Sequence, residues 1–145
     1  MPTRTARTAW NGTLQDGSGQ VELTSSGAGT YEVSFPKRAA DDADGTTSPE
    51  ELIAAAHAAC YAMSLSNEVA KAGGAPQALD VTADVTLGAD PDGGFKITEI
   101  KLTVEGEVEN LDADGFQAAA QAAKVGCPVS KALTGTTITL DASLA

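Results

Sequence analysis

Residues 48–71 read SPEELIAAAHAACYAMSLSNEVAK, a stretch with strong signals for a long helix. Ser48 is a favourable N-cap, Pro49 suits the first helical position, and Glu51 completes a capping box with Ser48. The rest of the stretch is rich in alanine and holds no helix breaker, and two glycines soon follow it. We therefore predict one helix of about six turns. Because Glu51 serves the cap, Glu50 remains free for another role.

Short segments of β-favouring residues on both sides of this helix predict strands. The predicted strands are residues 8–10, 21–24 and 30–35 before the helix, and 79–87, 95–108 and 136–140 after it. Pro36 ends the third strand, and residues 37–47 form a polar loop that begins with Lys37 and Arg38. A cluster of turn residues at 90–94 joins the two longest strands as a hairpin.

Two more helices are expected near the end of the chain. Asp112 can cap a helix that ends at Gly126, and Cys127 precedes a further helix start with Pro128 at its first position. The order of three strands, a long helix, two strands, helices and a strand indicates an α+β fold. A length of 145 residues predicts a single domain that spans residues 1–145.

The composition limits the partners of the protein. Nine Lys and Arg residues stand against twenty Asp and Glu residues, which argues against nucleic acid and anionic membranes as partners. The N-terminus has no apolar stretch typical of a signal peptide, so we expect a cytoplasmic protein. Only 4% of the residues are aromatic, so the core is built mainly from small aliphatic side chains. A core this thin favours oligomerisation.

Cys60 and Cys127 are the only cysteines, and their separation fits neither a zinc ribbon nor a thioredoxin motif. They can be buried small hydrophobic residues. They can also join His57, which lies three residues before Cys60, in a metal site, although a structural zinc needs four ligands. The third alternative is thiol redox chemistry, which requires a stabilised thiolate.

A redox role needs a positive charge near the reacting sulfur. Cys60 lies in the middle of its predicted helix, so the helix dipole stabilises its thiolate little. Arg38 lies in the loop that enters this helix, and Glu50 could orient its guanidinium. Cys127 is a rival nucleophile because a helix N-terminus lowers the pKa of a thiol. His57 could serve as a base or simply pack in the core, and the residues alone leave these alternatives open.

Two motifs in the chain resemble those of the OsmC/Ohr family, the osmotically inducible and organic hydroperoxide resistance proteins. The first is the run TSPEELIAAAHAACYAM at residues 47–63, and the second is GCPVS at residues 126–130. The variant HAAC at residues 57–60, together with FPKR at residues 35–38, resembles the OsmC branch more than the Ohr branch. The likeness extends over essentially the whole chain.

The resemblance implies an intertwined α+β homodimer, with antiparallel sheets around a long buried central helix. Two active sites at the subunit interface are implied as well. The resemblance also implies a cysteine-based peroxidase in which Cys60 is the peroxidatic residue and Cys127 resolves it. Arg38 and Glu50 would activate the thiol and hold the peroxide. No catalytic role for His57 is implied.

The implied reaction reduces organic hydroperoxides, and hydrogen peroxide less efficiently, and requires no haem, flavin or metal cofactor. The expected partners are the hydroperoxide, a dithiol reductant of dihydrolipoyl or thioredoxin type, and a second copy of the chain. Two alternatives come from other classes of protein. One is a small-molecule binding protein with a non-catalytic cysteine pair, and the other is a Cys/His metal-binding module.

Overall fold

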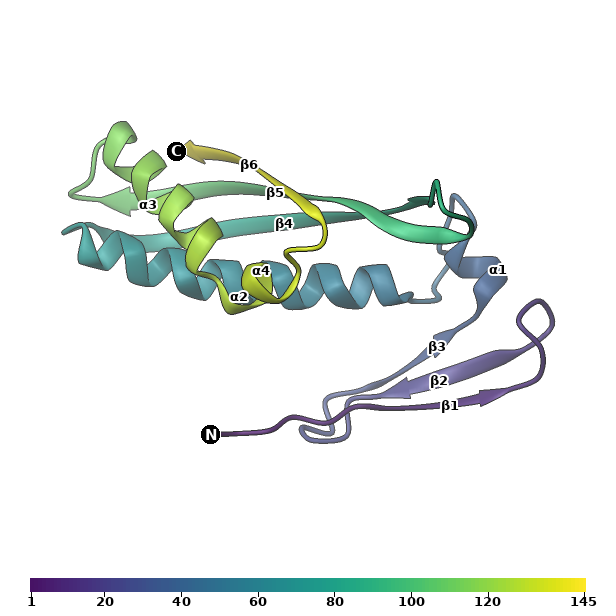
Figure 1. Ribbon diagram of the computed structural model, residues 1–145. Helices are drawn as coiled ribbons and strands as arrows, with labels where there is room; N and C mark the ends of the chain where they lie inside the picture. The colour runs from purple at the N-terminus through teal and green to yellow at the C-terminus, as the bar shows by residue number, and fades with distance from the viewer. The chain divides into compact units, whose positions relative to one another are not determined.

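The computed structural model describes residues 1–145 as two compact units, residues 1–52 and residues 53–145 (Figure 1). The first unit holds a three-stranded antiparallel sheet with β2 in the centre. Its strands are β1 (Arg7–Asn11), β2 (Ser18–Glu22) and β3 (Thr30–Val33). The three strands predicted before the long helix are therefore confirmed, although their bounds differ from the prediction. Val21 in the central strand pairs with Thr8 on one side and with Tyr31 on the other.

The end of the third strand differs from the prediction. β3 stops at Val33, and Phe35–Arg38 form the short helix α1. The Ser34 hydroxyl accepts a hydrogen bond from the Lys37 backbone N–H, and Pro36 lies in the first turn, where it costs no helical hydrogen bond. Arg38 was predicted at the start of a loop and instead lies in the last turn of this helix.

The long helix α2 (Pro49–Lys71) confirms the prediction from the opening stretch. The Ser48 hydroxyl accepts from the Glu51 backbone N–H at 3.1 Å, as a capping box requires. The second bond of a capping box would join the Glu51 carboxylate to the Ser48 backbone N–H. Here the carboxylate instead accepts a hydrogen bond from the hydroxyl of the neighbouring Thr47. Gly73, with a positive φ of 90°, follows the last turn, where glycine has little conformational strain.

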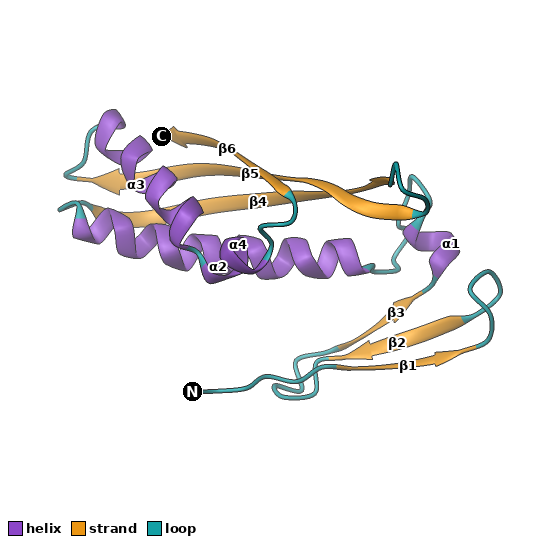
Figure 2. Cartoon of the chain, in the orientation of Figure 1, coloured by secondary structure: helices purple, strands orange, loops and turns teal.

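The second unit contains a three-stranded sheet, and Figure 2 shows its strands and helices. The strands are β4 (Ala75–Ala89), β5 (Phe95–Glu109) and β6 (Thr137–Leu144). β4 and β5 form the expected antiparallel hairpin, but β6 runs parallel to β5, which corrects the expectation of purely antiparallel sheets. The reason is the crossover through α3 (Ala113–Gly126) and α4 (Pro128–Ala132). It returns the chain to the end of the sheet at which β5 starts, so β6 runs in the same direction as β5.

The hydrophobic core of the second unit lies between this sheet and the helices. α2 contributes Tyr61, Leu65 and Val69, which follow one another at four-residue spacing. β5 contributes Leu102 and Val104, and α3 contributes Phe116 and three alanines. The core thus joins a few large side chains with small aliphatic ones, as the low aromatic content predicts. None of the helices is long and apolar enough to cross a membrane.

Candidate active site

The two cysteines, which are 67 residues apart in the sequence, meet in the second unit. Their sulfur atoms lie 2.9 Å apart and share a hydrogen bond, and both thiols are free. Cys60 lies on α2 and is half-buried, whereas Cys127 is fully buried at the junction of α3 and α4. A disulfide needs an S–S distance of about 2.05 Å, so an approach of roughly 1 Å would join them.

The environment of Cys127 favours its thiolate. Burial raises the pKa of this thiol, but the hydrogen bond with Cys60 and the donors at the start of α4 lower it further than burial raises it. These donors are the backbone N–H groups of Ser130 and Val129 and the Ser130 hydroxyl. The neutral sulfur accepts no capping hydrogen bond of normal geometry. The donors therefore act mainly on the charged form of the sulfur.

Cys60 has the opposite tendency. Burial raises the pKa of its thiol, and the hydrogen bond with Cys127 raises it further. The Val129 backbone N–H and the Ser64 hydroxyl lower it, but less than burial and Cys127 raise it. In the neutral pair the Cys127 Sγ donates to the Cys60 Sγ. When the pair ionises, the opposite directions of the two pKa shifts favour the first negative charge on Cys127. For Cys60 to be a thiolate, it needs a positive charge from outside this pair.

His57 makes a contact that the sequence analysis did not anticipate. Its Nε2 lies 2.7 Å from the Ser130 Oγ, and both side chains are buried. Its Nδ1 has no hydrogen-bond partner. Burial lowers the pKa of the imidazole, so the ring is neutral at pH 7. Ser130 is the last residue of the GCPVS motif, but nothing in that motif predicts which residue of α2 it contacts.

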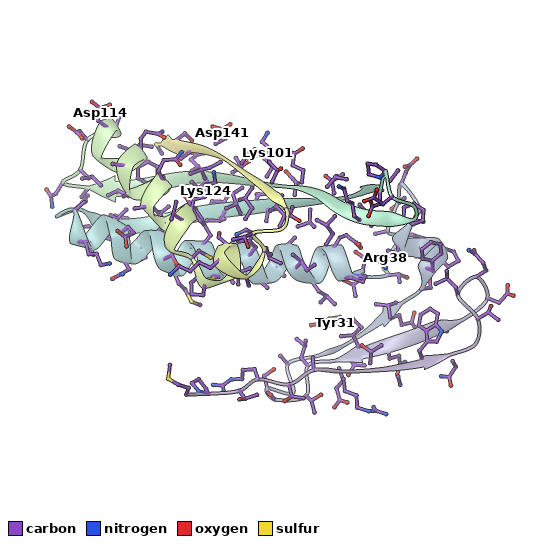
Figure 3. All side chains as sticks on the ribbon, viewed as in Figure 1. Tyr31, Arg38, Lys101, Asp114, Lys124 and Asp141 are labelled. Atoms are coloured by element: carbon purple, nitrogen blue, oxygen red, sulfur yellow. The ribbon has the colours of Figure 1, made fainter.

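Arg38 and Glu50 form an ion pair within the first unit, as predicted. The Arg38 Nη2 donates to the Glu50 Oε1 at 2.7 Å, and its Nε donates to the same oxygen at 3.0 Å. Glu50 is only 7% exposed, whereas the Arg38 side chain on α1 is partly exposed. Figure 3 labels Arg38 among the side chains. The Thr47 backbone N–H donates to the Glu32 carbonyl on β3, which ties the start of α2 to the sheet. Because two nitrogen atoms of Arg38 donate to the Glu50 carboxylate, this carboxylate fixes the plane of the guanidinium.

An apolar cavity of about 520 Å³ lies beside this ion pair in the first unit. Strand and loop residues line one part of it, including Trp10, Leu14 and Val21. Arg38 contributes the charged group of the lining. A cavity of this composition can bind the hydrocarbon part of a ligand next to a planar cation.

The structure gathers no group of three or more His, Cys, Asp or Glu side chains that could hold a metal ion. The metal-binding alternative required His57, Cys60 and Cys127 as ligands. In the structure the His57 Nε2 is engaged with Ser130, and the two sulfur atoms are engaged with each other.

Comparison with known proteins identifies the family. A sequence model of the OsmC-like proteins matches residues 41–141. The chain belongs to the OsmC/Ohr family. It is 43% identical to peroxiredoxin OsmC of Escherichia coli over 135 residues, which cover 93% of this chain and 92% of the relative. It is 34% identical to the organic hydroperoxide resistance protein OhrB of Bacillus subtilis over 106 residues, which cover 72% and 74% of the two chains.

The fold of this OsmC/Ohr protein also matches solved structures. The crystal structure of Bacillus subtilis OhrB superposes with a TM-score of 0.75 at 29% sequence identity, covering 95% of this chain and 97% of the other. An organic hydroperoxide resistance protein OsmC from Legionella pneumophila gives a TM-score of 0.72 at 25% identity, covering 100% and 98%. The α+β class and the long helix of the prediction are therefore confirmed.

Proposed function

We propose that this OsmC/Ohr protein is a thiol peroxidase that reduces organic hydroperoxides, and hydrogen peroxide less efficiently, to alcohol and water. The observation that carries the proposal is the 2.9 Å approach of Cys60 and Cys127, because a peroxidase of this type needs a second thiol beside the first. The names of its relatives, a peroxiredoxin and an organic hydroperoxide resistance protein, agree with this chemistry.

The proposed reaction has two oxidative steps. The Cys60 thiolate attacks the distal oxygen of the hydroperoxide, the O–O bond breaks, and the alkoxide takes up a proton and leaves as an alcohol. Cys60 is then a sulfenic acid. The Cys127 thiolate attacks this sulfur, hydroxide leaves and is protonated to water, and a Cys60–Cys127 disulfide forms. A dithiol reductant of dihydrolipoyl or thioredoxin type then supplies two electrons and restores both thiols.

Arg38 and Glu50 complete the proposed site. Cys60 requires an external positive charge to ionise, and Arg38 is the cation that a buried carboxylate holds in a fixed orientation. The apolar cavity beside Arg38 suits the hydrocarbon part of an organic hydroperoxide. We place the two sites of an intertwined homodimer at its subunit interface.

The remaining proposals concern the molecule as a whole. We propose that residues 1–145 form one OsmC/Ohr-like domain, a proposal supported by the family match that runs from residue 41 to residue 141. We also propose that the protein works in the cytoplasm, where a reducing environment keeps both cysteines available as thiols.

Thiol titration before and after one equivalent of an organic hydroperoxide tests the function. The peroxidase predicts the loss of two thiols per chain, because Cys60 and Cys127 form a disulfide. A small-molecule binding protein would lose none. A metal-binding module would protect its thiols until a chelator is added. Either of these two results would reject the proposed function.

A further inference from the structure

We propose that His57 and Ser130 are positioning residues that stabilise the Cys127 thiolate, so that Cys127 is the sulfur released when a dithiol opens the Cys60–Cys127 disulfide. The reductant is thereby directed to the Cys60 sulfur. This inference rests on the proposed peroxidase cycle, because it assigns the direction of its reductive step. It gives His57 a role in the reaction.

The hydrogen-bonding pattern of His57 determines the direction of its contact with Ser130. A neutral imidazole carries a proton on only one nitrogen. If the proton were on Nδ1, a buried N–H donor would have no partner, which is rare in folded proteins. The proton on Nε2 leaves only a lone pair unpaired and donates to the Ser130 Oγ at 2.7 Å. The structure therefore favours the Nε2–H tautomer.

This tautomer leaves the single Ser130 hydroxyl proton free for another acceptor. Ser130 lies in the first turn of α4, three residues after Cys127, and its hydroxyl is one of the groups that lower the pKa of the Cys127 thiol. His57 thus prevents the hydroxyl from donating toward α2. Once Cys127 is a thiolate, the hydrogen bonds would run in one direction, from the imidazole N–H through the hydroxyl to the sulfur, and such chains strengthen each other.

The titratable groups that interact with Cys127 supply no positive charge that could stabilise its thiolate in place of the hydrogen bonds from His57 and Ser130. They are Cys60 and Tyr61, both on α2. The Tyr61 hydroxyl donates to the Ala120 carbonyl at 3.0 Å, and burial followed by the charge of Cys127 raises its pKa, so it stays neutral. Neutral donors therefore stabilise the Cys127 thiolate, and the Ser130 hydroxyl is the one donor among them that His57 orients.

In disulfide exchange, the cysteine sulfur that leaves more easily decides which of the two sulfur atoms the reductant attacks. A reductant thiolate attacks one sulfur of the disulfide, a new S–S bond forms, and the other sulfur leaves with the electron pair. The better leaving group is the thiol of lower pKa. Cys60 is partly exposed, whereas Cys127 is fully buried and its thiolate is stabilised, so attack occurs at Cys60 and gives a mixed disulfide there. The second thiol of the reductant then attacks the reductant sulfur of the mixed disulfide and releases Cys60. The reductant becomes a disulfide, and its two electrons have reduced both cysteines.

The first experiment measures the pKa of Cys127 directly. In a Cys60→Ser background, the ultraviolet absorbance of the thiolate is followed against pH. Ser130→Ala should raise the pKa of Cys127 by roughly one unit, equivalent to a tenfold smaller thiolate fraction near neutral pH. Ser130→Thr keeps a hydroxyl and should preserve the wild-type value. His57→Leu removes the donor and should give part of the shift, whereas His57→Gln keeps an N–H and should give less.

The second experiment identifies the sulfur that the reductant attacks. The disulfide is formed with diamide rather than a hydroperoxide, and a monothiol, cysteamine, traps the mixed disulfide for mass spectrometry. We expect the adduct on Cys60 in the wild type and on both cysteines in Ser130→Ala. An adduct on Cys127 in the wild type, or a pKa of Cys127 unchanged in both Ser130→Ala and His57→Leu, overturns the inference. Neither experiment uses a hydroperoxide, so both test this inference separately from the proposed function. The proposed peroxidase function is overturned by a different result, namely a wild-type protein that consumes no hydroperoxide.

Discussion

At the scale of single residues, the two cysteines differ in what their replacement should do. Cys60→Ser should abolish hydroperoxide consumption, since a hydroxyl is too weak a nucleophile without an activating base. Cys127→Ser should keep the first turnover and then accumulate sulfinic and sulfonic acid at Cys60, because no second thiol traps the sulfenic acid. Mass spectrometry of each variant after hydroperoxide treatment checks this. Oxidised Cys127 in an active Cys60→Ser variant would invert the assignment.

The guanidinium of Arg38 should matter for its shape as well as its charge. Arg38→Lys keeps the positive charge but loses the Nε and Nη2 donors that together bind both oxygens of Glu50. We expect turnover to fall roughly tenfold to thousandfold, the usual scale for a preorganised electrostatic contact. Steady-state kinetics with an organic hydroperoxide measures the effect. Arg7→Lys is the matched control, and a loss of turnover in the control alone would move the role to Arg7.

His57 should make the stability of the reduced protein depend on pH. The pKa of His57 is lowered in the folded state, so below about 6.5 the unfolded chain binds more protons than the folded one. The free energy of unfolding should therefore fall as the pH drops from 6.5 toward the folded pKa, by at most about 1.4 kcal/mol per pH unit. Urea unfolding at fixed protein concentration measures this slope. His57→Gln, which cannot titrate, should lose it; an unchanged slope would contradict the prediction.

The sequence could predict some of these contacts and not others. The Arg38–Glu50 pair could be inferred because the capping box uses Glu51 and leaves one acid near the only arginine of the preceding loop. The contact between His57 and Ser130 joins residues 73 positions apart. Its formation depends on how α4 packs against α2. No local pattern encodes that packing.

At the scale of elements, helices were predicted better than strand ends and sheet direction. The caps at Ser48 and Asp112 are local signals, and both form as expected. Ser34 is an equally local cap, but the β-branched and aromatic residues before it suggested a longer strand. The parallel pairing of β6 with β5 could not be predicted from the sequence, because it depends on the path of the helices between the two strands.

The packing of α3 on β5 leads to a prediction about one glycine. A Cβ atom at Gly106 would lie 2.6 Å from the ring of Phe116, which is fully buried in the core. Gly106→Ala should therefore lower the free energy of unfolding by about 1–3 kcal/mol, the usual cost of overpacking. Gly135→Ala, where no atom lies within 4 Å, is the matched control for urea unfolding. Equal stability of the two variants would show that α3 adjusts freely.

At the scale of the whole molecule, we predict an obligate homodimer. Val21 is the only buried hydrophobic side chain within residues 1–52, while Trp10, Leu14 and Tyr31 of the same unit are exposed. On α2, Met63 is 74% exposed on the face opposite the core residues. A three-stranded sheet with so little buried apolar surface is not stable by itself. A second copy of the chain would cover these side chains.

Association must overcome the charge of the chain, which is −11 and repels a second copy. Added salt screens this repulsion, so the dimer should become tighter as the ionic strength rises, as expected for a largely apolar interface between like-charged subunits. Light scattering at low micromolar concentration, at low and high salt, measures the mass, and peroxidase assays of the same samples measure the activity. Because the proposed sites lie at the subunit interface, activity should fall in proportion to the dimer on dilution. A single-chain species with full activity would contradict both the dimer and the shared sites.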